Sequence, residues 1–408
     1  MNKRSLALIM ATAALALCFL SPFAGAVTIG YTADSGGESV SISENYDVDN
    51  SVTVKESTDI SFGNLQVDQE RTAEGTGEAD LKQTITGKTA DGAQYTAEND
   101  IKSDGTVDAK TYTSATGNTL GVAQTVSATG DVQLRLEGEE GGNLARQSAV
   151  VGNGRLNSKQ TLDIGNSVRA SLAASIWGDF GRAFSWAVDA DGNWADTSVS
   201  MTYGKLSTKQ EAEADGSATT GQLSHVDAEL GVARSEAEDA DGNRAGTLVF
   251  MDNGELSTKQ GAEADGSATT GQESHVDAEW GRAGCGAEDA DGNWASTWVE
   301  MENGTLSTKQ EAEADGSATA DQRSDVDADS GGAGSRAVDA DGNRAETNVS
   351  MENGELSTVQ EAEADGSATT GQESHVDAEL GDADSWARDA DGNRAATKVE
   401  MENGTLST

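Results

Sequence analysis

A fifty-residue repeat constrains the fold of this chain more than any other feature of its sequence. The segment Leu-Ser-Thr starts at five positions from Leu206 to Leu406, and Asp-Ala-Asp-Gly-Asn recurs with the same fifty-residue step. Self-similarity at such a period is typical of arrays in which each unit packs on its neighbours. Weaker copies extend upstream. The sequence therefore predicts degenerate β-repeats over residues 27–155 and regular fifty-residue β-repeats over residues 156–408, with the last unit incomplete.

Turn residues divide each unit into four predicted strands. Asn303-Gly304 is typical of a two-residue hairpin turn, in which both residues have positive φ. The segments around Asp265-Gly266 and Asp291-Gly292 are typical of three-residue loops with glycine in the left-handed conformation. A fourth turn is expected near Trp280-Gly281, with room for a bulge. The pattern predicts an all-β fold with four antiparallel strands in each unit.

Alternation of residue types assigns one face of each predicted strand to the interior. In the unit from Leu256 this face holds small and apolar residues with a few Thr, Ser and Gln, while the opposite face is charged. The turn lengths keep the assignment consistent from strand to strand. The predicted interior residues are Leu256, Thr258, Gln260, Ala262, Ala264, Ala268, Thr270, Gln272, Ser274, Val276, Ala278, Ala283, Cys285, Ala287, Ala295, Thr297, Val299 and Met301.

A single buried face made of small residues favours a long up-and-down meander or a solenoid-like sheet. A propeller has a similar repeat length, but its blades stack on both faces. Small side chains bury little apolar area each, although they let two sheets approach closely. We therefore expect the sheet to fold back on itself or to pack on another protomer. Its unpaired edge strands are templates for end-to-end addition.

The N-terminus predicts a secretory signal peptide over residues 1–26. Lys3 and Arg4 precede an apolar stretch, and Ala24 and Ala26 form a small-residue cleavage site. Removal of this segment leaves 25 basic side chains against 71 acidic ones, a net charge of −46. Such a surface repels nucleic acid and anionic lipid and attracts cations. We expect an extracellular protein at the cell surface, in which Cys285 is the one remaining cysteine.

No catalytic or cofactor-binding constellation is predicted, and the expectation is that the protein is not an enzyme. Three histidines, His225, His275 and His375, occupy one repeat position and are expected to lie on the surface. The repeated Asp-Ala-Asp-Gly-Asn turns are candidates for calcium, because alternating Asp and Asn oxygens suit a hard cation. An ordinary Asp-Gly turn is the alternative reading. The candidate calcium ligands are Asp189, Asp191, Asp239, Asp241, Asp289, Asp291, Asp339, Asp341, Asp389 and Asp391.

Tandem repeats such as Leu306-Ser-Thr-Lys-Gln and Asp339-Ala-Asp-Gly-Asn, behind a signal peptide, resemble archaeal cell-surface and sheath proteins. The resemblance covers the whole chain in composition and implies a proteinaceous envelope layer. Our first hypothesis is a structural protein that self-assembles into a sheath, surface layer or fibre. The second is a repeat-type adhesin or stalk that binds carbohydrate or another cell through its variable outer face. The N-x-S/T sequences at Asn303, Asn348 and Asn403 are candidate glycosylation sites on the surface. Tryptophans such as Trp186 and Trp386 are expected to pack against a neighbouring layer, with binding of sugar or a partner as the alternative.

Overall fold

A computed structural model describes most of the chain beyond its first 24 residues. The described ranges are 25–35, 38–48, 52–61, 66–88, 94–116, 119–164, 168–214, 218–264, 268–313, 318–363 and 368–407. The predicted signal peptide therefore lies almost wholly outside the described residues, and so do the predicted loop residues 265–267. The described chain is all-β. It forms two compact units, Met1–Asp179 and Phe180–Thr408.

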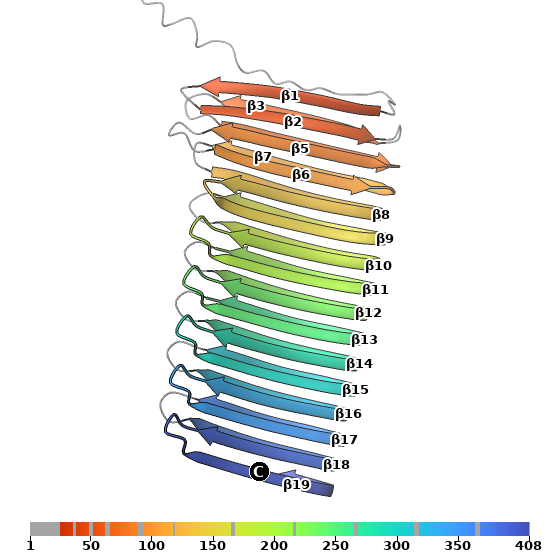
Figure 1. Cartoon of the computed structure of the whole chain (residues 1–408). Coiled ribbons are helices and arrows are strands. Elements are labelled where there is room, and N and C mark those ends of the chain that lie inside the picture. The colour runs from red at the N-terminus through yellow and green to blue at the C-terminus, as the bar shows by residue number, and fades with distance from the viewer. Residues whose placement is uncertain are drawn as a thin grey trace, which may run out of the picture. The chain divides into compact units, whose positions relative to one another are not determined.

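The first unit is built largely from short strands, and its last strands are longer. They are β1 (Gly25–Ser35), β2 (Glu38–Val48), β3 (Thr53–Ser61), β4 (Gln66–Thr76), β5 (Ala79–Lys88), β6 (Gln94–Ser103), β7 (Thr106–Thr116), β8 (Thr119–Glu140) and β9 (Asn143–Ile164). β1, β2, β5 and β6 pair in that order, and β3, β4 and β7 pair separately. β8 joins the two sets, since its first half pairs with β7 and its second half with β6. Figure 1 shows β3 and β7 behind β2, β5 and β6.

The second unit is an antiparallel meander of strands that have 20 residues each, except the last, β19, which has 14. The strand β10 (Arg169–Val188) spans the division between the units. It is followed by β11 (Trp194–Glu213), β12 (Thr219–Glu238), β13 (Arg244–Glu263), β14 (Thr269–Glu288), β15 (Trp294–Glu313), β16 (Thr319–Val338), β17 (Arg344–Glu363), β18 (Thr369–Arg388) and β19 (Arg394–Ser407). From β11 onward each strand pairs with the next (Figure 1).

Each long strand of the second unit folds back on itself near its middle. In the paired register Ala233 of β12 faces Val249 of β13, and Gln260 lies eleven residues further along β13. A straight strand would carry Gln260 about 36 Å away. Instead the Nε2 of Gln260 donates a hydrogen bond of 3.2 Å to the backbone oxygen of Ala233. The two halves of β13 therefore lie in two facing layers, and the sheet is folded over along its length.

The arms of the bent strands give two layers, which we name by their connections. Layer A holds the arms joined by the Asp-Ala-Asp-Gly-Asn turns, such as 280–288 of β14 and 294–302 of β15. Layer B holds the other arms, such as 269–278 and 304–313. Each fifty-residue unit thus contributes four arms from two strands, and these arms are the four predicted strands. Of the two predicted ways to bury the small-residue face, the second unit uses folding back on itself.

The Asn-Gly step is a bend inside a continuous strand, so the prediction of a hairpin turn there is wrong. A type I′ turn needs positive φ at both residues. Asn303 has a φ of 51°, but Gly304 is not among the positive-φ residues. The register skips Asn303 and Glu279, which lie opposite one another between the Ala278–Gly304 and Trp280–Glu302 pairs. Both strands therefore bend together and cross from layer A to layer B.

Gly304 is expected to tolerate no side chain at this bend. A Cβ at Gly304 would lie 2.0 Å from the backbone oxygen of Asp327 in the neighbouring strand. Gly304→Ala is therefore expected to lower the free energy of unfolding by about 1–3 kcal/mol. Gly261→Ala is the matched control, because its Cβ would lie 3.7 Å from the nearest atom. Urea unfolding measures both, and equal effects of the two substitutions would contradict this account of the bend.

The prediction of the interior face is confirmed. All of the interior residues predicted for the unit from Leu256 are buried, including Leu256 itself and Met301. The interior glutamines connect the layers, since their Nε2 atoms donate to backbone oxygens of the facing layer. These bonds join Gln210 to Ala183, Gln222 to Ser198, Gln260 to Ala233, Gln272 to Leu248, Gln310 to Ala283, Gln322 to Trp298, Gln360 to Ala333 and Gln372 to Asn348.

The small side chains of the core bury little apolar area, and the hydrogen bonds of the glutamines link layer A to layer B directly. Each bridge replaces a hydrogen bond to water with one inside the fold, which contributes about 1 kcal/mol on balance.

Within the described part of the chain there is no helix of the length and apolar character that a membrane crossing requires.

Candidate functional site

The first aspartate of each Asp-Ala-Asp-Gly-Asn turn is an internal acceptor of its own turn. The Oδ1 of Asp289 accepts hydrogen bonds from the backbone N–H groups of Asp291 and Asn293, at 3.0 and 2.9 Å. Its Oδ2 accepts from the Asn293 side chain at 2.7 Å. Gly292 adopts a φ of 93° and closes the turn. The predicted Asp-Gly turn is therefore present, and Asp289 is buried within it.

Consecutive turns are linked by their asparagines. The Oδ1 of Asn243 accepts a hydrogen bond of 2.9 Å from the backbone N–H of Ala290, in the next turn along the array. The same contact joins Asn193 to Ala240, Asn293 to Ala340 and Asn343 to Ala390. Each asparagine thus donates to the aspartate of its own turn and accepts from the following turn. This ladder ties the turn ends of layer A together.

The two aspartates of each predicted calcium pair differ in burial. Asp189, Asp239, Asp289 and Asp339 are buried in their turns, whereas Asp191, Asp241, Asp291, Asp341 and Asp391 are exposed. In the last turn, the side-chain hydrogen bond from Asn393 lowers the pKa of Asp389. Among the described residues, no group of three or more His, Cys, Asp or Glu side chains is arranged to hold a metal ion. The carboxylates of the first aspartates are engaged by their own turns.

The three histidines lie in one row on the outer surface of layer B. His275 pairs in register with Ser257 and Ser307 on its two neighbouring strands. His225 and His375 occupy the same place in β12 and β18, and Asp325 takes it in β16, where it accepts a hydrogen bond from Ser357. Histidines two strands apart are about 10 Å from one another. Serines stand between them in the row, and the histidines belong to no group of three or more potential metal ligands among the described residues.

Cys285 is buried at 6% exposure and faces the core, as the strand pattern predicts. Burial raises the pKa of its thiol, and its sulfur lies 3.1 Å from the Thr297 hydroxyl. The tryptophans of the second unit, by contrast, face outward on layer A. Arg336 stacks over Trp294 and Arg344 stacks over Trp386, with centroid distances of 4.9 and 4.5 Å. These pairs are half-buried cation–π contacts, which contribute about 0.5–1 kcal/mol each.

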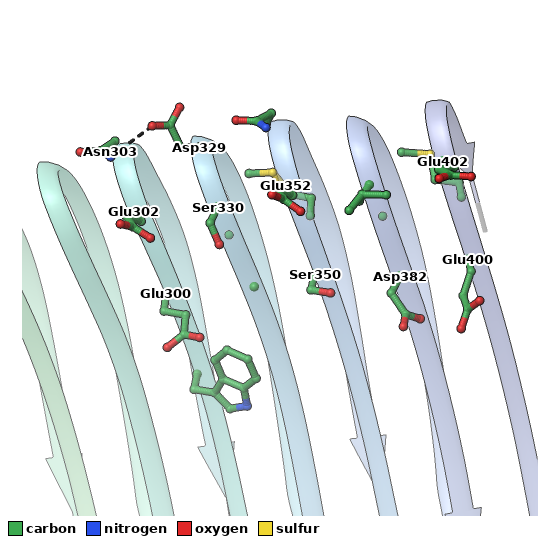
Figure 2. Close-up of a pocket in the computed structure, with 18 residues that line it drawn as sticks. Glu300, Glu302, Asn303, Asp329, Ser330, Ser350, Glu352, Asp382, Glu400 and Glu402 are labelled. Atoms are coloured by element: carbon green, nitrogen blue, oxygen red, sulfur yellow. Dashed lines mark hydrogen bonds between the residues drawn. The ribbon is translucent and has the colours of Figure 1, made fainter.

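An open acidic groove of about 1070 Å³ lies beside the bends of β15 to β19. Figure 2 shows its carboxylates pointing outward from successive strands. They are Glu300, Glu302, Asp329, Glu352, Asp382, Glu400 and Glu402. The Asn303 side chain donates to Asp329 at 3.1 Å, so the asparagine of this predicted glycosylation sequence lies on the groove wall. Asn348, of the second such sequence, is hydrogen-bonded to Glu346.

The side chain of Lys398 forms ion pairs with two carboxylates of this groove, on β18 and β19. The Nζ of Lys398 lies 2.8 Å from Glu400 and 3.3 Å from Asp382. The hydrogen bonds that Lys398 donates to Glu400 and then to Asp382 raise the pKa of Lys398, and Lys398 in turn lowers the pKa of Glu400. The groove was not foreseen from the sequence, because its carboxylates come from five strands that only the bends bring to one rim.

The outer faces of the two layers differ in how strictly they repeat. On layer B most outward positions keep one residue type, as in Ser207, Ser257, Ser307 and Ser357, although Val359 replaces the lysine of Lys209, Lys259 and Lys309. On layer A they change: one outward position holds Trp186, Glu236, Gly286, Arg336 and Trp386 in successive units. Comparison with known proteins found no matching family model, no matching curated protein and no matching solved structure.

Proposed function

We propose that this protein is an extracellular structural protein that self-assembles through its β-sheets into a sheath, surface layer or fibre of the cell envelope. It acts by packing and not as an enzyme, and it needs no cofactor. The observation that carries the proposal is the repetition of layer B, most of whose outward positions keep one residue type from unit to unit. Equivalent residues recur about every 10 Å along the array. A periodic face of this kind suits contact with a periodic neighbour.

Hydrogen bonds inside the array favour a structural role for the protein. Glutamine bridges join the two layers at each unit, and the asparagine ladder joins successive turns. In repeat arrays the stability of each unit depends on its contacts with its neighbours. A side chain that links neighbouring units therefore strengthens the array along its length. The net charge of −44 keeps the outer surface hydrated and draws cations to it.

Size-exclusion chromatography and negative-stain microscopy of the chain, with and without millimolar calcium, test this proposal. We expect large particles such as sheets, rings or filaments that resist denaturant. Calcium is expected to promote assembly, because it screens the repulsion between acidic surfaces. A monodisperse monomer in both conditions would rule out self-assembly.

The variable outer face of layer A favours a second candidate, a repeat-type adhesin or stalk that binds carbohydrate or another cell. Outward tryptophans such as Trp294 and Trp386 offer flat apolar rings beside arginines. Aromatic rings with nearby polar groups are suited to partners that have one apolar face. A glycan array on the soluble chain distinguishes this candidate, since an adhesin binds defined glycans as a monomer.

A further inference from the structure

We infer that the outer face of layer A over β12 to β15 is a docking surface for a second copy of this chain, seated face to face. The inference rests on the proposed function, because it names the surface through which self-assembly begins. It is carried by an apolar patch, by a neighbouring recess floored with glycine, and by the low local charge of both.

The apolar patch crosses three adjacent strands. Leu230 and Val232 of β12 lie beside Phe250 of β13, and Phe250 packs edge-on against Trp280 of β14 with ring centroids 4.9 Å apart. Leu248 continues the patch and is 43% exposed. A contiguous exposed apolar patch with a polar rim is typical of an interaction site.

Beside the patch lies a recess of about 360 Å³ floored by Gly246, Gly284 and Gly286. A Cβ at Gly246 or Gly286 would have no atom closer than 3.6 Å, and neither residue has positive φ. Neither packing nor backbone conformation therefore demands glycine at these two positions. Glycine weakens a strand, and within one it often marks a place where another molecule approaches closely.

The outward-facing residues of β14 are complementary in size to the same residues read in the opposite direction along the strand. It reads Trp280, Arg282, Gly284, Gly286, with two large residues followed by two glycines. Consider a two-fold axis that lies between the two facing copies, perpendicular to the strands and level with Ala283. This axis places Trp280 of one copy over Gly286 of the other. It also places Arg282 over Gly284. An isologous contact requires this kind of self-complementarity.

The same axis fits the neighbouring strand. Val249 of β13 pairs in register with Ala283, so the axis passes over both residues. It then brings Leu248 of one copy onto Phe250 of the other. Layer A over β12 to β15 measures about 19 Å by 33 Å, or about 630 Å². A standard interface takes about 800 Å² from each partner, so the contact extends onto the flanking strands β11 and β16, which bring the face to about 950 Å².

Charge favours layer A over layer B for the first contact between two copies, which precedes contacts through the periodic face of layer B. Two copies that each carry a net charge of −44 repel, so they dock where the local charge is lowest. On β12 to β15 the outer face of layer A has three arginines against six carboxylates. The outer face of layer B on the same strands has two lysines against nine carboxylates, which are Asp227, Glu229, Glu255, Glu263, Glu273, Asp277, Glu279, Glu311 and Glu313.

Two glycine-to-glutamate substitutions test the docking surface. Gly286→Glu fills the recess with a residue that β12 carries at the same place, Glu236. Gly261→Glu makes the same change on layer B, where Glu211 and Glu311 occupy the equivalent positions. In sedimentation velocity on the full chain, Gly286→Glu is expected to raise the dissociation constant of the first association step at least tenfold. Gly261→Glu is expected to change it less than twofold.

Trp280→Ser is a second probe, because Ser330 stands at the equivalent position of β16. It is expected to weaken association as well, with circular dichroism confirming that both variants keep the fold. If the parent chain assembles and Gly286→Glu assembles equally well, the docking surface is wrong while the proposed function stands. If the parent chain stays monomeric up to about 100 μM in the presence of calcium, both are wrong.

Discussion

Gln322→Glu is expected to lower the free energy of unfolding of this protein by about 4 kcal/mol at pH 7, with much less effect at pH 4. Gln322 is 2% exposed, and its Nε2 donates a hydrogen bond of 2.8 Å across the core to the backbone oxygen of Trp298. A carboxylate at this position has no hydrogen to donate, so the oxygen of Trp298 would lose its partner. The charge itself would also be buried.

The size of the effect follows from the cost of burying a charge. Among the described residues, no hydrogen-bond donor reaches the Oε1 of Gln322, so a carboxylate would find little compensation there. Burial raises the pKa of a glutamate by up to about 3–5 pH units. Each pH unit corresponds to about 1.4 kcal/mol, so a rise of three gives about 4 kcal/mol.

The sign of the pH dependence is fixed by the same argument. The pKa of the substituted glutamate is raised in the folded state above its unfolded value of about 4.3. Folding then binds a proton, so the variant approaches the stability of the parent chain below about pH 4 and loses it as pH rises toward 7. A protonated carboxyl can also donate to the oxygen of Trp298. Urea unfolding of variant and parent chain at pH 4 and pH 7 measures the difference.

Gln133→Glu provides the control for this substitution. Gln133 lies on the exposed side of β8, where a new carboxylate stays hydrated. Its expected effect is below about 0.5 kcal/mol at either pH, as for other surface substitutions. If Gln322→Glu were as mild as Gln133→Glu at pH 7, the glutamines would not be bridges within a dry core, and the two-layer packing of the second unit would have to be revised.

The alternation of residue types was sufficient to predict which side chains are buried. In a strand this information is local, because successive side chains point to opposite faces whatever the rest of the chain does. The predicted interior positions of Ala283, Cys285 and Val299 follow directly from it. The acceptor of each interior glutamine was not predictable. It is a backbone oxygen on the facing layer, and its position depends on where the strand bends.

The prediction of a hairpin turn at Asn303-Gly304 is wrong for a physical reason. Asn-Gly predisposes the backbone to positive φ, and it does so at Asn303. Whether the chain then reverses or continues depends on the next residue and on the neighbouring strands. Here Gly304 stays out of the left-handed region, and the backbone of β16 approaches it so closely that a Cβ would not fit. The contact is tertiary, so a hairpin and a bend share the same local sequence signal.

Asp289→Ala is expected to lower the free energy of unfolding by about 2–4 kcal/mol. The carboxylate of Asp289 accepts two backbone hydrogen bonds and one from Asn293, and these donors are buried or half-buried. Removing it leaves the donors without their acceptor, which costs about 1–3 kcal/mol for a buried group. It also frees the Asn293 side chain, whose Oδ1 holds the N–H of Ala340 in the next turn. Thermal unfolding monitored by circular dichroism measures the loss.

Asp291→Ala is the matched substitution in the same turn, and the pair separates the turn from the calcium hypothesis. Asp291 is exposed, so its removal is expected to cost less than about 0.5 kcal/mol if the aspartates serve the turn. If calcium were held by both aspartates, each substitution would instead lower calcium affinity in isothermal titration calorimetry, and calcium would stabilise the parent chain more than either variant. An unchanged unfolding temperature in Asp289→Ala would contradict the turn account. The hydrogen bonds to Asp289 lead us to expect the asymmetric result, because its oxygens already have their donors.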